Sequence, residues 1–355
     1  MGTGVYSALK VMRYPDRIWA WLAGRPAAPV HVRIKPLNRC NHDCWYCAYR
    51  AGSLQLGEQM DEGDRLPADQ LRGIARDLVA MGVAAVTFSG GGEPLLYREL
   101  PEIVEILGEG GVRVAALTNG SNLKGRMAEA FARHGTWVRV SVDAVDDEGY
   151  ARTRGIGPGN FTRLLDNMSD FAARGSRCTL GVSLIVGTEN APRIAEACTL
   201  FKAAGASHVK LSGVVVDNGH DANEAYHAPL RPIVQAQIAE ARRLEEDGFR
   251  IVDHYHALPE RFDKPYGSCP SMRFLTVIGA DGCVYACQDK AYTEAGRIGS
   301  LDGRSFAEFW SDPATQAFLA GLDPRRACAH HCVAHTKNLV LQEIAGLDPD
   351  HGAFV

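Results

Sequence analysis

The sequence predicts an α/β protein, with a parallel sheet covered by helices that forms a full or partial TIM-like barrel, followed by a small C-terminal module of a β-hairpin and a helix. Three observations support this fold class. Between residues 28 and 255, short β-branched runs alternate with helical stretches, as in parallel sheets covered by helices. Polar and glycine-rich segments follow several runs, at the strand ends where such barrels carry their working residues. Five cysteines lie after residue 268, beyond the alternating region.

The chain divides by pattern into three regions. We expect an N-terminal helical extension over residues 1–27, the barrel over 28–255 and the C-terminal module over 256–355. Residues 5–24 are apolar with scattered basic positions, which fits either a segment at a membrane surface or a helix packed on the main domain. The packed helix is favoured because Pro15 interrupts the amphipathic pattern.

The individual elements follow from residue type and period. The predicted strands are the β-branched runs His31–Pro36, Ala84–Phe88, Val112–Leu117, Trp137–Val142, Thr179–Val186, His208–Ser212 and Phe249–Val252. The predicted helices between and after them are Ala68–Met81, Leu100–Glu109, Leu123–His134, Phe161–Arg174, Ala191–Ala204 and Pro232–Asp247. In the C-terminal region, Phe274–Ile278 and Cys283–Cys287 read as the strands of a hairpin around a tight Ala-Asp-Gly turn.

Composition narrows the functional classes. The 355 residues are 46% hydrophobic and 23% charged, which suits a globular protein with a substantial core. A net charge of −4 argues against nucleic acid or an anionic membrane as the main partner. No stretch predicts a membrane span or a secretory signal, so we expect a cytoplasmic protein whose ten cysteines are reduced.

Three cysteines follow the first predicted strand with C-x3-C-x2-C spacing: Cys40, Cys44 and Cys47. Three thiolates on one loop can hold three irons of a [4Fe–4S] cluster. The fourth iron is then free to bind a small molecule and pass it an electron. Zinc would need a fourth ligand, for which His42 is the available side chain, and a disulfide would use an even number of cysteines.

Three more motifs fall at successive strand ends. They are Gly91-Gly-Glu-Pro94, Thr118-Asn-Gly120 and Ser141-Val-Asp143. Each alone is an ordinary turn or helix cap. In this order after this cysteine loop, residues of about 28–255 resemble the radical S-adenosylmethionine (SAM) superfamily, whose core is a partial (β/α)6 barrel.

The resemblance implies a reaction and a set of sites. In that family the open iron binds SAM, whose reductive cleavage yields a 5′-deoxyadenosyl radical that abstracts hydrogen from substrate. It implies a flavodoxin- or ferredoxin-type reductant, and it makes Cys40, Cys44 and Cys47 the cluster ligands. By position, the SAM-binding residues would be Tyr46 near the adenine, Gly91, Gly92 and Glu93 at the methionine amino group, Thr118 and Asn119 along the pocket, Ser141 and Asp143 at the ribose, Gly187 near the adenosine, and Arg154, with Arg152, at the carboxylate.

The C-terminal cysteines resemble a second family feature. The spacing C-x12-G-x4-C from Cys269 through Gly282 to Cys287 is similar to the opening of SPASM and twitch modules, which carry auxiliary clusters. The shortness of the set favours a twitch-like module with one auxiliary [4Fe–4S] cluster. Its expected ligands are Cys269, Cys287, Cys328 and Cys332. The last pair departs from the usual C-x2-C, so His330, His331 or His335 could replace the final ligand, and a zinc knuckle is the alternative site.

The remaining cysteines have other expected roles. Cys283 is either a catalytic hydrogen-atom donor, as in radical SAM epimerases, or a buried small hydrophobe, the fate also expected for Cys178 and Cys198. Residues 214–229 should form a polar loop over the barrel mouth. Its candidate substrate contacts are Asp217, His220, Asp221 and Tyr226, each of which could equally be solvated.

The expected substrate is a small polar molecule such as a sugar, an aminocyclitol or a nucleotide-linked sugar. The expected outcome is dehydrogenation, or epimerisation if Cys283 is the donor. This rests on analogy from fold and module. The alternatives are a peptide-modifying radical enzyme, a radical decarboxylase and a non-catalytic iron–sulfur electron carrier.

Overall fold

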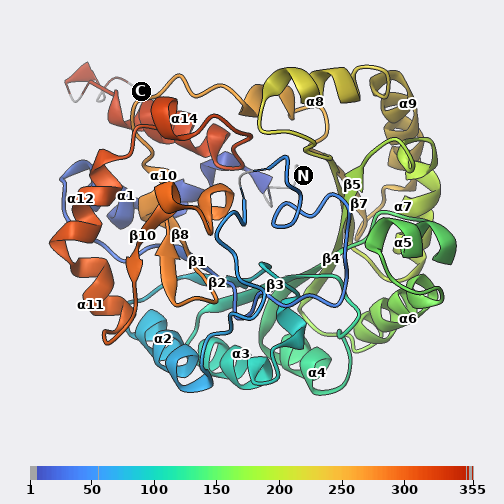
Figure 1. Ribbon diagram of the computed structural model, residues 1–355, viewed down its shortest axis with the longest axis horizontal. Helices are drawn as coiled ribbons and strands as arrows, with labels where there is room; N and C mark the ends of the chain where they lie inside the picture. The colour runs from blue at the N-terminus through green and yellow to red at the C-terminus, as the bar shows by residue number, and fades with distance from the viewer. Residues whose placement is uncertain (1–5, 55, 349, 352–353, 355) are drawn as a thin grey trace.

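The computed structural model describes residues 6–54, 56–348, 350–351 and 354. Residues 1–5 of the expected N-terminal extension, and residues 349, 352–353 and 355 of the expected C-terminal module, lie outside this part. The described chain forms one curved, mostly parallel sheet with helices on its outer side (Figure 1). The predicted α/β class is confirmed.

Ten strands form the sheet in the order β10-β9-β8-β1-β2-β3-β4-β5-β6-β7. From β8 through β1 to β7 every pairing is parallel, and β9 and β10 are antiparallel. The edge strands β10 and β7 do not pair with each other in the described residues, so the barrel stays open. The strands are β1 (His31–Ile34), β2 (Ala85–Phe88), β3 (Arg113–Thr118), β4 (Gly135–Ser141), β5 (Thr179–Val186), β6 (His208–Gly213), β7 (Arg250–Asp253), β8 (Leu275–Ile278), β9 (Cys283–Tyr285) and β10 (Arg297–Ser300).

Helices cover the outer face of the sheet, with α2, α3 and α4 side by side along one flank in Figure 1. The α-helices are α1 (Pro15–Leu22), α2 (Ala68–Ala80), α3 (Leu100–Glu109), α4 (Gly125–His134), α5 (Asp147–Arg154), α6 (Asn160–Ala172), α7 (Ile194–Ala203), α8 (His220–His227), α9 (Arg231–Ala241), α10 (Ser271–Phe274), α11 (Phe306–Ser311), α12 (Pro313–Gly321), α13 (Pro324–Ala327) and α14 (His335–Ala345). Short 3-10 turns are η2 (Ala8–Arg13), η3 (Pro94–Leu96), η4 (Ala191–Arg193), η5 (Arg242–Leu244), η6 (Pro259–Arg261), η7 (Gln288–Lys290) and η8 (Glu294–Gly296).

Along β1, β4 and β6, the period of two separates a face buried against the helices from a more polar face. On β1, Val32 and Ile34 are fully buried in the core shared with the helices, while His31 and Arg33 alternate with them and stay half-buried. The same alternation runs along β4 and β6. Full burial of one such aliphatic side chain stabilises the fold by about 1.5–3 kcal/mol. The concave face is thereby left with the long polar side chains.

Two helices correct the sequence-based expectations. Residues 214–229 were expected to form a loop, but α8 occupies His220–His227. Its start is fixed by Asn223, whose side chain accepts from the Val216 amide at 2.9 Å and donates to the Asp217 carbonyl at 2.8 Å. The helix α5 follows β4, where no helix was expected, because Asp146 caps its first turn and Gly155 ends it in a left-handed conformation.

The C-terminal region joins the same sheet. The predicted hairpin is confirmed as β8 and β9, and β8 also pairs in parallel with β1, placing Val277 opposite Arg33. The expected domain boundary at residue 255 therefore falls inside one continuous sheet and stays a prediction.

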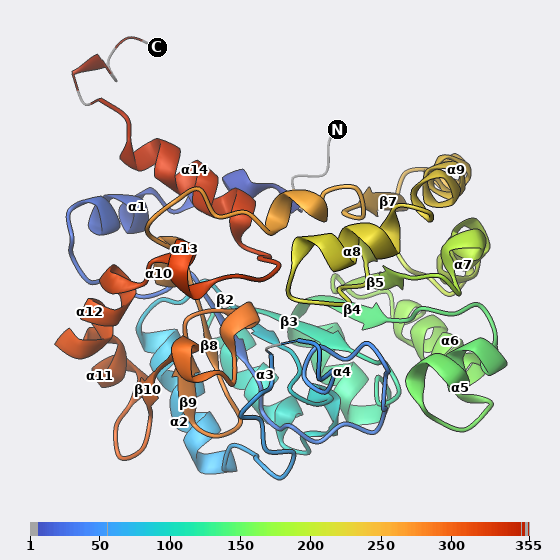
Figure 2. The ribbon, with the colours of Figure 1, turned by 45° about the horizontal axis from the view of Figure 1, so that its top comes forward.

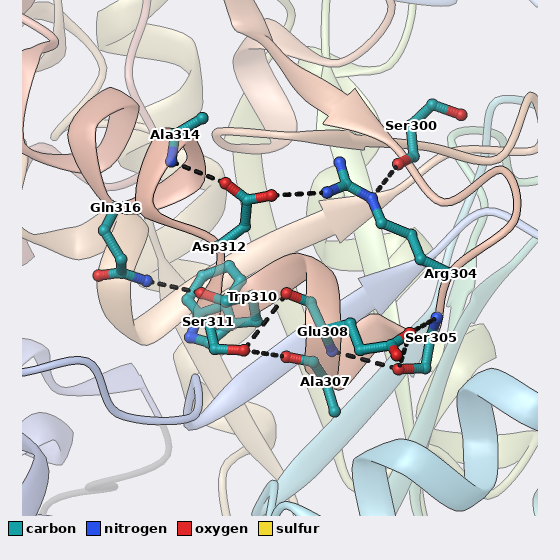
Figure 3. A network of polar contacts seen from close by, with 10 residues as sticks. All are labelled: Ser300, Arg304, Ser305, Ala307, Glu308, Trp310, Ser311, Asp312, Ala314 and Gln316. Atoms are coloured by element: carbon teal, nitrogen blue, oxygen red, sulfur yellow. Dashed lines mark hydrogen bonds and ion pairs between the residues drawn. The ribbon is translucent and has the colours of Figure 1, made fainter.

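Beyond β10, a polar network shapes the connection between α11 and α12 (Figure 3). Ser305 and Glu308 form a reciprocal capping box at the start of α11. Asp312 accepts from the Ala314 amide at 2.8 Å, which caps α12, and its other oxygen binds Arg304 at 2.9 Å. Each such cap stabilises its helix by about 1 kcal/mol. These short helices are therefore fixed by local bonds as well as by the burial of Phe306 and Phe309.

The N-terminal helix packs on the C-terminal one. Ile18 of α1 shares a small buried cluster with Phe274 and with Leu341 of α14. Figure 2 shows α14 and α1 on the same side of the molecule. The expectation of a packed helix is confirmed for the described part of residues 5–24. Among all the residues that the structure describes, no helix is both long enough and apolar enough to cross a bilayer.

Candidate active site

The cysteine loop leaves the C-terminal end of β1 and carries three half-buried free thiols, Cys40, Cys44 and Cys47. Burial raises the pKa of the Cys40 thiol to about 11, and the neighbouring Cys44 adds to the shift. Burial also raises the pKa of Cys44, and Cys47 acts in the same direction. The three sulfurs are therefore close enough to repel one another as thiolates, as ligands of one anionic cluster must be.

Two arginines face these sulfurs. Arg154 lies with Nη1 3.5 Å from Sγ of Cys44. The Cys40 and Cys47 thiolates attract the Arg50 guanidinium electrostatically. Nη1 of Arg50 donates to the His42 carbonyl at 3.0 Å. Guanidinium groups offset the charge of deprotonated thiols. The donor set and its counter-charges fit a cluster with three protein ligands.

The glycine turn after β2 packs directly on the backbone that leads into the cysteine loop. The Gly92 amide donates to the Leu37 carbonyl at 3.2 Å, and the Glu93 amide donates to the Arg39 carbonyl at 3.0 Å. A Cβ on Gly92 would overlap the Arg39 backbone, and one on Gly91 would overlap the Asn38 side chain. Glycine is thus required here for backbone approach, and the expected contact of Gly91 and Gly92 with SAM stays a prediction.

Glu93 is buried and holds the turn to the end of β3. Its carboxylate accepts hydrogen bonds from the Thr118 hydroxyl at 2.6 Å, the Asn119 amide at 2.7 Å and the Leu95 amide at 2.9 Å. The Asn119 side chain continues to Asn41 of the cysteine loop at 2.8 Å. Three expected SAM-binding residues, Glu93, Thr118 and Asn119, therefore form one connected group that also positions the cysteines.

Asp143 is the centre of a second group, at the end of β4. It accepts from the Tyr46 hydroxyl, from Arg154 and, at 2.6 Å, from the Ile185 amide. Asp143 and Arg154 form an almost fully buried ion pair. Burial raises the pKa of Tyr46 well above its usual value, so this phenol is a neutral donor. The structure thus brings Tyr46, Asp143 and Arg154 together.

Three other expected positions flank this group. Ser141 is half-buried and pairs in register with Ser183 of β5. The Gly187 amide donates to Asn190 at 2.9 Å, and Asn190 donates to the Asp143 carbonyl at 2.9 Å. Arg152 points elsewhere, into exposed ion pairs with Glu148 and Glu189.

The four expected auxiliary ligands, Cys269, Cys287, Cys328 and Cys332, come from three segments, with Cys328 and Cys332 on the loop between α13 and α14, and act on one another. Burial raises the pKa of Cys287 well above its usual value, and the other three thiolates add to the shift. Asn338 donates to the Cys269 sulfur at 3.2 Å. In the described part of the chain, no three Cys, His, Asp or Glu side chains are close enough to hold a single metal ion.

That spacing bears on the choice between zinc and a cluster. Thiolates about 2.3 Å from one zinc ion must lie within about 4 Å of one another. Cluster thiolates bind different irons and can lie farther apart. The four thiolates act on one another, as ligands of one cluster would. His335 lies 3.2 Å from the Tyr266 hydroxyl. His330 bonds the His331 carbonyl at 2.6 Å through Nδ1, while its Nε2 is buried without a partner in the described residues, so its role as an alternative final ligand stays a prediction.

Cys283 lies in an apolar cluster with Val277, Tyr285 and Tyr292. Burial raises the pKa of its thiol to about 11. The surroundings are those of a structural cysteine, and its hydrogen-donor role stays a prediction. Cys178 and Cys198 are buried in the main core, as expected.

Of the four residues expected around the barrel mouth, one contacts the segment after β5 and the other three bond to their own neighbours in sequence. Tyr226 of α8 reaches the fifth-strand motif, with its hydroxyl 3.1 Å from the Thr188 amide. The Asp217 carboxylate accepts a hydrogen bond from the Gly219 amide at 2.7 Å. The His220 ring lies 3.1 Å from the carboxylate of the exposed Asp221. Only Tyr226 is thereby placed beside the expected SAM-binding positions.

Sequence reasoning missed a buried bridge between the two cysteine sets. Lys35, just beyond β1, is fully buried and donates to the Tyr49 hydroxyl at 2.6 Å, to the Gly90 carbonyl and to Gln288 at 3.3 Å. Gln288 is next to Cys287. A lysine inside the apolar run His31–Pro36 was a signal for such a role. Its partner 253 residues away was not visible in the sequence.

Two protein-family models match separate parts of this chain. Residues 34–201 match the radical SAM superfamily. Residues 269–333 match the SPASM iron–sulfur cluster-binding domain. The chain carries a radical SAM domain followed by a SPASM domain. The expected family and the cofactor classes, SAM and iron–sulfur clusters, are confirmed, and the second module is a SPASM domain.

Curated relatives of this radical SAM protein differ in activity. It is 27% identical over 297 residues to the PqqA peptide cyclase of Xanthomonas euvesicatoria, covering 80% of this chain and 74% of that protein. It is 31% identical over 172 residues to the GTP 3′,8-cyclase of Marinobacter nauticus, covering 47% and 49%. It is 31% identical over 109 residues to an S-adenosylmethionine-dependent nucleotide dehydratase of Lacinutrix mariniflava, covering 31% and 22%. The last two matches span half of the relative or less.

Solved structures share the radical SAM fold. Streptococcus suis SuiB bound to its precursor peptide SuiA superposes with a TM-score of 0.62 at 15% identity, covering 87% of this chain and 71% of SuiB. The structure of anSMEcpe with bound AdoMet gives a TM-score of 0.58 at 16% identity, covering 86% and 89%. At these identities the likeness concerns the fold alone.

Proposed function

We propose that this radical SAM enzyme abstracts a hydrogen atom from a small polar substrate and completes a dehydrogenation or an epimerisation. When the cofactors are bound, one-electron reduction of SAM at the open iron supplies a 5′-deoxyadenosyl radical. We assign Cys40, Cys44 and Cys47 to the iron ligands and the Asp143 and Glu93 groups to the SAM-binding wall. A flavodoxin- or ferredoxin-type protein is the proposed reductant.

The observation that carries the proposal is the buried bridge of Lys35 and Gln288 between the glycine turn and Cys287. Dehydrogenation of an alcohol gives one hydrogen atom to the radical and then releases one electron and one proton. An electron acceptor close to the substrate is therefore needed. We assign that role to an auxiliary cluster on Cys269, Cys287, Cys328 and Cys332, which the bridge ties to the SAM side of the site.

Peptide modification is the second candidate. It is favoured by the similarity to PqqA peptide cyclase over 80% of this chain. Against it stands the concave face of the sheet, where charged side chains such as Arg33, Arg139 and Lys210 suit a compact polar ligand better than a chain of mixed side chains.

The test starts from anaerobically reconstituted protein, which should hold about eight irons if both clusters are of the [4Fe–4S] type. Cys269→Ala should reduce the iron content to about four, and the matched variant Cys178→Ala should not. About eight irons retained in Cys269→Ala would contradict the auxiliary site.

The substrate class is tested by the rate of 5′-deoxyadenosine formation. A panel of nucleotide-linked sugars, sugar phosphates and aminocyclitols is compared with short peptides. Acceleration by a small molecule supports the proposal, and acceleration by peptides alone supports the second candidate. Turnover in deuterated water then separates the outcomes, because an epimerase that uses Cys283 must place deuterium in its product and Cys283→Ala must not.

A further inference from the structure

Three long cationic side chains project onto the concave face of the sheet. Arg33 of β1, Arg139 of β4 and Lys210 of β6 each alternate with neighbours that are fully buried against the helices. By the period of two, all three point away from those helices. They come from strands spread around the curved sheet, so their side chains converge over its hollow side.

The charges of Arg33 and Arg139 act on Lys210. Burial lowers the pKa of Lys210 to about 7, and Arg139, Arg261 and Arg33 all lower it further. Arg261 donates to His254 at 3.2 Å, and the pKa of His254 is lowered to about 4 by burial and by Lys210, Arg261 and Arg139. Every charge that acts on Lys210 is therefore positive.

Some hydrogen-bond donors of the cationic side chains on the concave face have no partner in the described residues. The Nε atoms of Arg33 and Arg139 and the hydroxyl of Ser212, two residues beyond Lys210, are buried without a partner in the described residues. Arg139 donates through Nη1 to the Tyr6 hydroxyl at 3.0 Å. Arg139 and Lys210 take part in none of the ion pairs between described residues, whereas the Asp289 carboxylate acts on Arg33. Buried cations without counter-charges are costly, and a ligand of opposite charge removes that cost.

We propose that Arg33, Arg139 and Lys210 bind an oxyanion of the substrate, a phosphate or a carboxylate, on the concave face of the sheet. This rests on the proposed function and names the chemical class of its small polar substrate. Guanidinium groups present paired donors that match the oxygens of both anions, and the ammonium adds a point charge. Ser212 supplies a neutral donor beside them.

The negative charge of an auxiliary cluster does not account for all three cations. The Asp289 carboxylate acts on both Arg33 and Arg261, and the thiolates of Cys287 and Cys332 act on Arg33 and Arg261 respectively, so these two arginines already face negative charge. The charges that act on Lys210 include no thiolate. Lys210 and its neighbour Arg139 are the pair that a substrate anion would neutralise.

The test measures anion binding by calorimetry to the anaerobically reconstituted full chain at fixed ionic strength. The probes are inorganic pyrophosphate, tricarballylate and uncharged glucose. Wild-type protein should bind at least one anion saturably and glucose not at all, and the tighter anion identifies the phosphate or carboxylate source. Arg139→Gln and Lys210→Gln should each weaken that binding about tenfold or more.

Two control variants separate a specific site from general charge. Arg113→Gln removes the same charge at the exposed start of β3 and should leave anion binding unchanged. Lys210→Arg keeps the charge and should retain binding, which excludes misfolding as the cause of loss. Equal weakening by Arg113→Gln, failure of both anions to bind wild-type protein, or binding that requires an anionic peptide would overturn the proposal. Formation of 5′-deoxyadenosine by the same wild-type preparation is measured separately, and its absence would contradict the proposed function without altering the anion result.

Discussion

The hydroxyl of Thr118 donates a 2.6 Å hydrogen bond to the carboxylate of Glu93. This bond joins the end of β3 to the glycine turn that follows β2. Because the same turn is bonded to the backbone just before Cys40, the carboxylate also fixes the cysteine loop. The radical SAM motifs of this chain thus form one mechanically connected unit before any cofactor binds.

Replacing Glu93 by Gln tests that unit. A glutamine amide would turn one of its nitrogen donors toward the donors of Thr118, Asn119 or Leu95, leaving a buried group unsatisfied. We expect a loss of about 1–3 kcal/mol in the free energy of unfolding, together with weaker SAM binding. Glu105→Gln, on the exposed side of α3, is the matched control and should change neither quantity.

Gly92→Ala should disrupt the cysteine loop without altering the rest of the sheet. The new methyl group would overlap the Arg39 backbone, which leads directly into Cys40. We expect loss of about half of the bound iron, measured after anaerobic reconstitution. Gly73→Ala, where the added Cβ meets nothing within 4 Å, should keep its iron and gain up to about 1 kcal/mol of helix stability. Normal iron in Gly92→Ala would show that the loop tolerates the contact.

The two arginines of α5 offer the same substitution in two environments. Arg154 and its partner Asp143 have 4% and 1% of their side chains exposed, whereas Arg152 is 57% exposed. Arg154→Gln leaves a buried carboxylate without its charge partner and should cost about 3–5 kcal/mol in the free energy of unfolding. Arg152→Gln should cost less than about 1 kcal/mol. Similar losses in denaturant titrations of the two variants would refute the importance of burial here.

Two half-buried histidines of the sheet should make stability fall in mild acid. Burial, with Arg139, lowers the pKa of His208 from 6.5 to about 4, and burial lowers that of His31 to about 3. Between the folded and unfolded pKa values the unfolded chain binds more protons, so stability rises with pH across that window and is lost as pH falls from 6.5 toward 4.

The slope of stability against pH provides the measurement. Each such histidine contributes up to about 1.4 kcal/mol per pH unit in this window. Denaturant titrations at a series of pH values should show a shallower slope for His208→Gln than for wild type. An unchanged slope in His208→Gln would mean that this ring is already charged in the native state.

Much of the barrel was predictable because its strands and helices have clear periods. The helix Leu100–Glu109 was predicted to the residue, since its apolar positions recur at helical spacing. The helix α8 was missed because its eight residues are polar and its start depends on the side chain of Asn223. The cysteine and glycine motifs could be recognised because each lies within a few residues of sequence. The Lys35–Gln288 contact and the β1–β8 pairing could not be predicted, because they join residues that are far apart in the sequence.

The pairing of β1 with β8 also dictates an order of events during synthesis. His31 lies opposite Leu275, so about 240 residues must leave the ribosome before β1 has both of its neighbours. Closing so long a loop is entropically costly, and strands with distant partners pair late. The segment carrying Cys40 is therefore synthesised early. It follows a strand, β1, that lacks one of its two neighbours until β8 has been synthesised. The sheet around the cysteine loop is therefore complete on both sides of β1 only after Leu275 and the rest of β8 have been translated.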